Sequence, residues 1–220
     1  MRAAGSGSGN PNMASGEFTK LRDRQVPETQ LSDHLRAIRD TLVDAFDGLE
    51  VLGFRGELTI LCAPEQVRDI LTFCRDDPTL SCEMLADLSG VHWPASQRVE
   101  RAEETTGWPS YEIESDEVGT IELDYMVRSL RHNHVFRVRT SVPDDDPRIA
   151  TVSDVYRSAN VMERETYDFF GVDFTDHPDL RRILMPDEWQ GFPHRKDYPL
   201  GGVEVQYEGA TVPPPDQRSY

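Results

Sequence analysis

The amino-acid sequence predicts an α+β domain in which helices pack on a mixed or antiparallel sheet of four to five strands. Apolar residues recur at helical spacing in three separate stretches, and two neighbouring stretches alternate apolar with polar residues. Beyond Gly171 the chain is rich in proline and glycine and shows neither period. We therefore divide the chain into a flexible tail at 1–27, an α+β domain at 28–171 and an extended C-terminal segment at 172–220.

The first half of the domain alternates predicted helices and strands. A helix is expected from about Glu28 to Gly48, because apolar residues repeat on one face at Leu31, Leu35, Ile38, Leu42 and Phe46. Residues 57–62 are rich in strand-forming side chains and predict a strand. Pro64 suits the first turn of a second helix, which ends before Pro78. A further strand is expected at 79–91.

An acidic stretch and a hairpin follow. Residues 93–118 contain proline and glycine and lack either period, which predicts a long surface insertion of unknown role. Residues 121–128 and 135–140 then alternate apolar with polar side chains around a short connection. This pattern predicts an antiparallel hairpin with one face in water.

A third helix is expected near residues 153–171. Ser153 is a candidate cap, and Asp154 places a negative charge in the first turn, where the helix dipole favours it. Gly171 offers the left-handed stop.

The extended C-terminal segment carries more large apolar side chains than a free tail would. Each gains roughly 1.5–3 kcal/mol from burial, so either this domain or a partner must cover them. They are Phe174, Leu180, Ile183, Leu184, Trp189, Phe192 and Tyr198.

Composition narrows the class of protein. Hydrophobic residues make up 37% of the 220 residues and charged residues 29%, which is typical of a folded globular chain. The formal net charge of −17 argues against binding to nucleic acid or anionic lipid, although acidity also simply favours solubility. No apolar run is long enough to span a membrane and no signal peptide is recognisable, so we expect a cytoplasmic chain.

The three cysteines, Cys62, Cys74 and Cys82, are predicted to be buried free thiols. Their number is odd, they lack a Cys-x-x-Cys spacing, and they lie in apolar segments. We therefore expect no iron–sulfur cluster in this chain.

Carboxylates at the end of the third helix raise the question of acid–base catalysis. The acids concerned are Glu163, Glu165 and Asp168. Residues two apart on a helix point to different faces, whereas Arg164 and Asp168, four apart, are neighbours. The helix dipole disfavours a negative charge at Asp168, so this carboxylate needs a cation or donor partner. We expect Arg164, Arg181 or Arg182 to supply it, and favour ion pairing over catalysis.

Other chemistries have weaker support. The cluster Asp173, Asp176, His177 and Asp179 and the pair His132 and His134 match no known zinc or calcium spacing. The sequence also lacks the Gly-x-Ser-x-Gly elbow and the glycine-rich loops that bind phosphate.

Two basic pairs, at 181–182 and 195–196, alternate with aromatic residues. Acidic neighbours cancel the field that a phosphate backbone requires, and these are Asp179, Asp187, Glu188 and Asp197. Arginines beside aromatic anchors favour docking onto another protein.

An ordered series of residues resembles the signature of a known family. The series runs through Glu163-Arg164-Glu165, Asp168-Phe169-Phe170-Gly171, His177-Pro178, Leu180-Arg181-Arg182-Ile183-Leu184, Trp189, Gly191 and Arg195-Lys196-Asp197-Tyr198-Pro199-Leu200. It is similar to the C subunit of NADH-quinone oxidoreductase, the thirty-kilodalton subunit family of respiratory complex I. Weaker similarity extends back over the preceding strands and helices.

The resemblance implies a structural subunit of the hydrophilic arm, peripheral to the cytoplasmic face of the bacterial membrane and without catalytic residues. It implies no cofactor in this chain, with FMN, iron–sulfur clusters and quinone held by partner subunits. It also implies that the C-terminal segment clasps the D subunit, which helps to form the quinone pocket, with iron–sulfur subunits nearby.

We expect one set of residues to form the partner interface and its structural support. It consists of Glu163, Arg164, Glu165, Asp168, Phe170, Gly171, His177, Arg181, Arg182, Trp189, Arg195, Lys196, Asp197 and Tyr198. Two alternatives stay open: an equivalent subunit of a membrane-bound hydrogenase or other quinone-linked dehydrogenase, and a stand-alone carboxylate-based hydrolase.

Overall fold

A computed structural model describes residues 31–95 and 118–199, together with the backbone of 205–207 and 210–212. The predicted tail at 1–27 and nearly all of the predicted insertion at 93–118 lie outside the described residues, as does most of the chain after Pro199.

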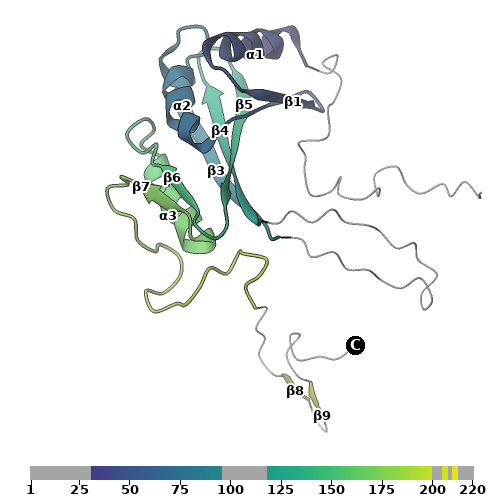
Figure 1. The fold of residues 1–220 in the computed structure, drawn as a ribbon, viewed down its shortest axis with the longest axis vertical. Helices are drawn as coiled ribbons and strands as arrows, with labels where there is room; N and C mark the ends of the chain where they lie inside the picture. Colours follow the sequence, from purple (N-terminus) through teal and green to yellow (C-terminus); the bar gives the residue numbers. More distant parts are fainter. Residues whose placement is uncertain (1–30, 96–117, 200–204, 208–209, 213–220) are drawn as a thin grey trace, which may run out of the picture.

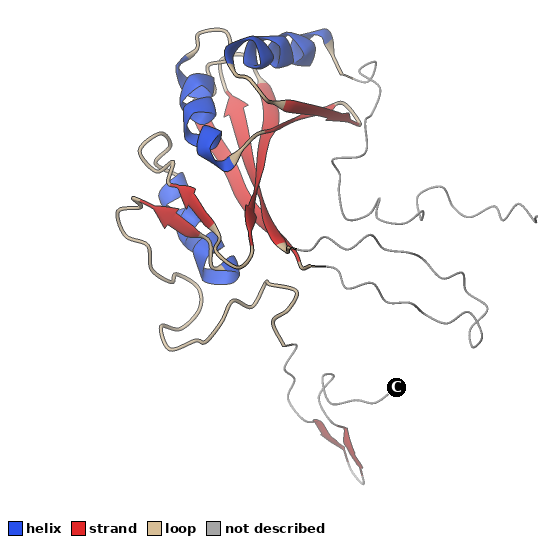
Figure 2. Ribbon diagram, viewed as in Figure 1, coloured by secondary structure: helices blue, strands red, loops and turns tan. Residues whose placement is uncertain are grey.

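A mixed five-stranded sheet forms the centre of the domain, where its strands are red in Figure 2. The strand order is β1-β2-β5-β4-β3. Its members are β1 (Glu50–Phe54), β2 (Glu57–Leu61), β3 (Met84–Trp93), β4 (Thr120–Ser129) and β5 (His134–Pro143). The pairing of β2 with β5 is parallel and the other pairings are antiparallel. The predicted α+β class with a mixed sheet is confirmed.

Three helices cover one face of this sheet (Figure 1). They are α1 (Asp33–Ala45), α2 (Val67–Asp76), which follows a 3-10 turn at Pro64–Gln66, and α3 (Ala159–Phe170). The core lies between helices and sheet and includes Leu42, Ile60, Ile70, Leu123, Tyr125 and Val138, all with no exposed surface. The three helical stretches expected from the apolar spacing are thus confirmed.

Helix boundaries follow local hydrogen bonds. Helix α1 begins after Ser32, whose hydroxyl accepts the Leu35 N–H at 3.3 Å. The predicted cap of the third helix at Ser153 is wrong, because the helix begins six residues later at Ala159. The Ser153 N–H instead donates to the Thr151 hydroxyl at 3.1 Å, within a turn that precedes the helix. Gly171 ends α3 in the left-handed conformation, as predicted, with φ +75°.

The observed strands differ from the predicted strands in two places. Strand β1 was not predicted, since Gly53 interrupts its short apolar run. The strand expected from residue 79 begins at Met84, because the Asp77 carboxylate accepts the N–H groups of Thr79 and Leu80 and holds a turn there. Buried Leu80 imitates a strand pattern inside that turn.

The predicted hairpin is confirmed as β4 and β5, but the face away from the helices is not simply in water. On it the guanidinium of Arg139, 5% exposed, forms two short bonds to the Asp124 carboxylate, at 2.5 and 2.7 Å. Glu122 lies 3.2 Å from the same guanidinium. Mutual pairing lets these charges lie on the central strands with little exposure.

Two small sheets complete the described structure. Strands β6 (Arg148–Ala150) and β7 (Asp173–Thr175) pair in parallel next to α3, and β8 (Val205–Tyr207) pairs with β9 (Ala210–Val212). Three of these short strands, β7, β8 and β9, belong to the predicted extended C-terminal segment. All three cysteines are free, as expected. Among the described helices, none has the length and apolar character to cross a membrane.

Candidate functional site

The candidate site is formed by the end of α3, the end of β3 and residues 176–199, which we call the C-terminal arm. In Figure 1 the arm leaves β7, passes the end of α3 and turns below the sheet. Nearly all the residues expected at a partner interface belong to α3 or to the arm. The contacts between α3 and the arm fix the position of the arm.

Asp168 on α3 is the main attachment point of the arm. Its side chain has no exposed surface, and its carboxylate accepts the backbone N–H groups of Ile183, Leu184 and Met185 at 3.1, 2.8 and 2.8 Å. Arg182 Nη1 donates to the other carboxylate oxygen at 2.8 Å. Burial alone would raise the pKa of Asp168, but these donors outweigh it and lower the pKa below its usual value.

Arginines tie the arm to itself and to the helix. Arg182, one of the expected cations for Asp168, is confirmed in that role, and its other amino group donates to the Gly191 carbonyl at 3.0 Å. Arg164 does not pair with Asp168 and instead donates to the carbonyls of Arg181 and Arg182, at 3.2 and 3.3 Å. Arg181 forms only an exposed ion pair with Asp179 at 3.0 Å.

A second attachment lies at the end of α3, around Gly171. A Cβ atom added there would lie 2.4 Å from the ring of Phe192, so only glycine allows the arm to pass this closely. The Arg195 guanidinium packs over the same ring, 5.3 Å from its centre. Arg195 also donates to the carbonyl oxygens of Phe170 and Asp144, at 2.6 and 2.9 Å. One arginine thus joins the arm, the helix end and the loop after β5.

His92 on β3 makes a third attachment that the sequence did not reveal. Its side chain has no exposed surface, and its Nδ1 accepts the backbone N–H of Lys196 at 2.9 Å. The neutral ring therefore carries its proton on Nε2, which donates to the Asp144 carboxylate at 3.0 Å. No motif marks His92, since a histidine in a predicted strand carries no distinctive spacing.

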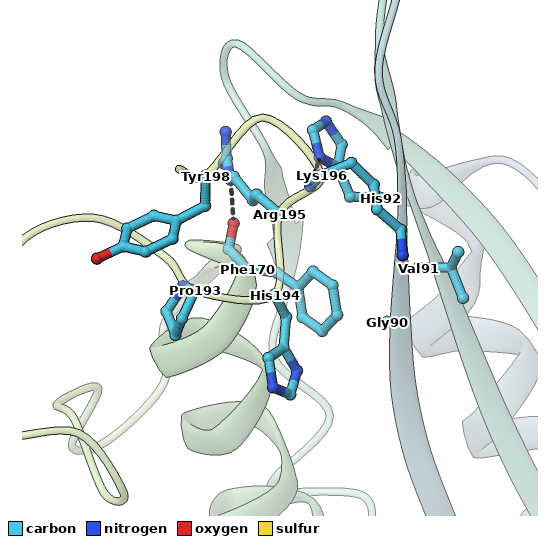
Figure 3. A pocket seen from close by; sticks show the side chains of 9 residues that line it. All are labelled: Gly90, Val91, His92, Phe170, Pro193, His194, Arg195, Lys196 and Tyr198. Carbon is cyan, nitrogen blue, oxygen red and sulfur yellow. Dashed lines mark hydrogen bonds between the residues drawn. The ribbon is translucent and has the colours of Figure 1, made fainter. Parts of the chain in front are cut away.

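A cavity of about 480 Å³ opens where the arm meets β3 (Figure 3). Its lining combines apolar and cationic groups: Gly90, Val91, His92, Phe170, Pro193, His194, Arg195, Lys196 and Tyr198. Phe170 packs against Gly90, where a Cβ atom would lie 2.9 Å from the ring. The His194 ring stacks on Phe169 at 4.0 Å between centres. This lining suits an acidic or aromatic side chain of a neighbouring protein.

Glu163 is buried and belongs to the scaffold. Its carboxylate accepts the Thr151 hydroxyl at 2.5 Å and the Val152 N–H at 2.7 Å. Burial raises its pKa to about 7, although these two donors oppose the rise. His177 lies 3.7 Å from Glu163, but its Nε2 donates to the Asn160 carbonyl at 3.1 Å and its Nδ1 accepts the Asp179 N–H.

The structure does not bring the three carboxylates into one catalytic site. Glu163 and Asp168 are each bonded to backbone donors, whereas Glu165 is exposed. In residues 31–95 and 118–199, no group of three or more His, Cys, Asp or Glu side chains is arranged to hold a metal ion.

The remaining predicted interface residues lie at the end of the arm. Tyr198 packs beside Trp189 at 6.5 Å between ring centres and donates its hydroxyl to the Gln190 carbonyl at 3.3 Å. The carboxylate of Asp197 lies 3.7 Å from His92 Nδ1. The arm leaves three large apolar side chains exposed to solvent: Ile183, Leu184 and Trp189.

An α+β domain with an ordered arm and exposed apolar side chains has the form of an interaction domain. The model of the family "Respiratory-chain NADH dehydrogenase, 30 Kd subunit" matches residues 60–204. The chain therefore belongs to this family, and the resemblance found in the sequence is confirmed.

Several curated relatives are named as the C subunit of NADH-quinone oxidoreductase. That of Streptomyces coelicolor is 43% identical over 182 residues, covering 83% of this chain and 61% of the relative. That of Acidothermus cellulolyticus is 42% identical, covering 86% of this chain and 87% of the relative. The chain spans about 60% of the length of the first two relatives it matches, those of S. coelicolor and Nocardia farcinica.

Two solved structures show similar chains. A trypsin-resistant fragment of Nqo5 is 27% identical, with a TM-score of 0.48 over 67% of this chain and 99% of the fragment. A chain of the membrane-bound sulfane sulfur reductase, an archaeal respiratory membrane complex, is 22% identical, with a TM-score of 0.53 over 76% of this chain and 87% of that chain. The second likeness concerns the fold alone.

Proposed function

We propose that this chain is a structural, non-catalytic subunit of a NADH:quinone oxidoreductase that translocates protons. Its C-terminal arm docks onto the neighbouring subunit that helps to form the quinone pocket. The chain holds no redox centre, and FMN, iron–sulfur clusters and quinone belong to partner subunits. It lies on the cytoplasmic face of the membrane as a peripheral component. Family membership and the names of its relatives support this assignment.

One observation carries the proposal: the backbone of 183–185 is fixed on the buried Asp168 carboxylate while neighbouring side chains face solvent. Leu184 is 59% exposed and Ile183 38% exposed, although both lie on a segment with ordered hydrogen bonds. A preorganised apolar surface loses little entropy when it binds, so such a surface suits a lasting protein contact.

The arrangement of the acids disfavours the alternative of a carboxylate-based hydrolase. A general acid or base must reach a substrate, but Glu163 and Asp168 have no exposed side-chain surface. Their oxygens are occupied by backbone, hydroxyl and guanidinium donors. These carboxylates therefore suit a structural role.

The test is a Leu184→Glu variant in a tagged chain expressed in its native host. A carboxylate in a buried apolar contact costs more than about 1.4 kcal/mol, so recovery of the quinone-pocket subunit should fall at least about tenfold. NADH:quinone reductase activity of the membranes should fall with it. Val43→Glu, at a 45% exposed site on α1, is the matched control and should leave both unchanged.

If Leu184→Glu assembles and reduces quinone like the wild type, the docking role of the arm is wrong. The identity of the co-purifying subunits also separates this function from that of a hydrogenase subunit, because only a NADH dehydrogenase brings NADH-oxidising partners.

A further inference from the structure

We propose that the chain has a second docking surface, at the end of the sheet farthest from the arm. This surface binds a second, different subunit of the same assembly, one that presents apolar side chains flanked by carboxylates. The inference rests on the proposed function, because it assumes that the chain works inside an assembly. Its residues are Met84, Arg128, Leu130, Arg131 and Val135, which we call the distal patch.

The register of the sheet places the centre of the distal patch in one row. Met84 on β3 pairs with Arg128 on β4, which pairs with Val135 on β5, so the three side chains lie side by side on one face. It is the face away from the helices, because the next residues in each strand, such as Val127 and Phe136, are buried in the core.

Three large apolar side chains of the distal patch are exposed to solvent. Met84 is 43% exposed and Val135 46%, and Leu130, in the turn between β4 and β5, is 64% exposed. A single exposed apolar residue on a surface needs no explanation, but neighbouring ones mark an interaction site. The distal patch is such a group of neighbouring exposed apolar residues.

The middle of this face is polar, and the two other large apolar residues that the structure describes as exposed on it, Phe54 and Val91, lie singly on the outer strands. Farther along the same strands, Arg139 is paired with Asp124 and Glu122, which satisfies the charges within the chain. The contact is therefore expected at the patch and not over the whole sheet.

The distal patch and the arm lie at opposite ends of β3. The arm meets β3 at Gly90 and His92, and Gly90 lies six residues beyond Met84 on one strand. A bulge between Leu85 and Asp87 leaves Gly90 opposite Leu123, five positions from Arg128 on β4, so at about 3.3 Å per residue the separation is about 17 Å. The paired charges of Arg139 and Asp124 lie between the two places, so an apolar contact on the arm does not continue onto the patch, which favours a different neighbour.

The charges of the distal patch indicate which chemical groups the partner presents. Arg128 and Arg131 are exposed, and among the described residues no carboxylate lies within ion-pairing distance of Arg128. Nearby Glu83 is already engaged, because it accepts the Leu130 N–H at 2.9 Å. In a chain of net charge −17, Arg128 and Arg131 give the distal patch two exposed positive charges, so a surface with carboxylates around apolar groups fits it. A second copy would bring the same arginines.

The distal patch is held in place before binding. Met84 and Val135 lie on paired strands, and the turn that carries Leu130 is held by Glu83 and by a bond from the His132 N–H to the Ser129 hydroxyl at 3.0 Å. Binding would order few additional groups, which favours a stable contact.

The experiment places a photo-activatable cross-linking side chain at Val135 in the intact assembly, with parallel insertions at Leu184 and Val43. We expect Val135 to cross-link a subunit different from the one captured at Leu184, at a peptide with Asp or Glu beside apolar residues. Val43, equally exposed, should give no specific product.

A Val135→Glu variant tests the contact without disturbing the fold, since the new carboxylate can pair with Arg128 in the neighbouring strand. Recovery of the second subunit should fall at least about tenfold, while that of the quinone-pocket subunit stays unchanged. Cross-links from Val135 to another copy of this chain, to the Leu184 partner only, or to nothing would overturn the proposal. So would an unchanged subunit inventory for Val135→Glu. Loss of the Leu184 product alone would instead refute the proposed function.

Discussion

At the scale of single residues, two buried carboxylates five positions apart on α3 have opposite shifts in pKa. Asp168 accepts three N–H groups and an arginine, which more than offset its burial, so its pKa falls. Glu163 accepts two neutral donors, which do not offset its burial, so its pKa rises to about 7. Glu163 lies deeper in the protein and has fewer and uncharged donors, so burial prevails at Glu163 and hydrogen bonding prevails at Asp168.

The substitution Asp168→Asn tests the attachment of the arm. It leaves Arg182 without its anion and sets an amide NH₂ against either Arg182 or the backbone N–H groups, so the free energy of unfolding should fall by about 3–5 kcal/mol. Denaturant unfolding measures this change. Asp179→Asn removes only the exposed pair with Arg181 and should change stability by less than about 1 kcal/mol. Equal effects of the two substitutions would refute the anchoring role of Asp168.

Glu163 makes stability depend on pH. Its pKa is raised from 4.5 to about 7 on folding, so the folded state binds more protons than the unfolded state between these values. The contribution of this group to stability is therefore lost as pH rises from about 4.5 through 7. Relative to Glu163→Gln, the wild type should lose up to about 3 kcal/mol between pH 4.5 and 8, measured by denaturant unfolding. A difference that stays constant with pH would contradict this prediction, and exposed Glu165→Gln is the control.

The role of a residue could be predicted from the sequence where that residue breaks a rule of local structure. A negative charge near the C-terminus of a helix is unfavourable, which pointed to a partner for Asp168 and to Arg182 among the candidates. The three N–H donors of the arm have no such signature, because backbone groups look alike in every sequence. His92 was missed for a related reason: its role depends on the arm returning to β3 from 104 residues away.

At the scale of elements, the end of α3 and the return of the arm depend on one glycine. Gly171 combines a left-handed backbone, φ +75°, with the close approach of Phe192. The sequence predicted the end of α3 correctly, since a glycine directly after an apolar stripe is a local signal for a helix end. Strand β1 and the true start of β3 were missed, because a short run with a glycine and a buried turn carry no period of their own.

The substitution Gly171→Ala should destabilise the domain through backbone strain and a clash with Phe192. Gly48→Ala is a matched control, because Gly48 has φ +76° but nothing within 4 Å of an added Cβ atom. We expect a loss of about 1 kcal/mol for Gly48→Ala from strain alone and a distinctly larger loss for Gly171→Ala. Thermal or denaturant unfolding of both variants measures the difference. Equal losses would show that the contact with Phe192 contributes nothing.

At the scale of the whole molecule, the sheet separates two surfaces. Three helices bury one face, paired charges occupy the middle of the other, and the arm and the distal patch lie toward opposite ends of β3. The α+β class, the mixed sheet and the family were predictable, because periodicity and an ordered motif are both local in sequence. The position of the distal patch was not, since it depends on the register of three strands, which no single stretch encodes.

A cross-link from Leu184 in the intact assembly shows directly which protein the arm contacts. A photo-activatable side chain at this position, with Val43 as the control site, is irradiated, and the joined peptides are identified by mass spectrometry. We predict a product with the subunit that helps to form the quinone pocket, and none from Val43. A Leu184 product confined to this chain itself, or no product in an active assembly, would show that the arm does not dock onto that subunit.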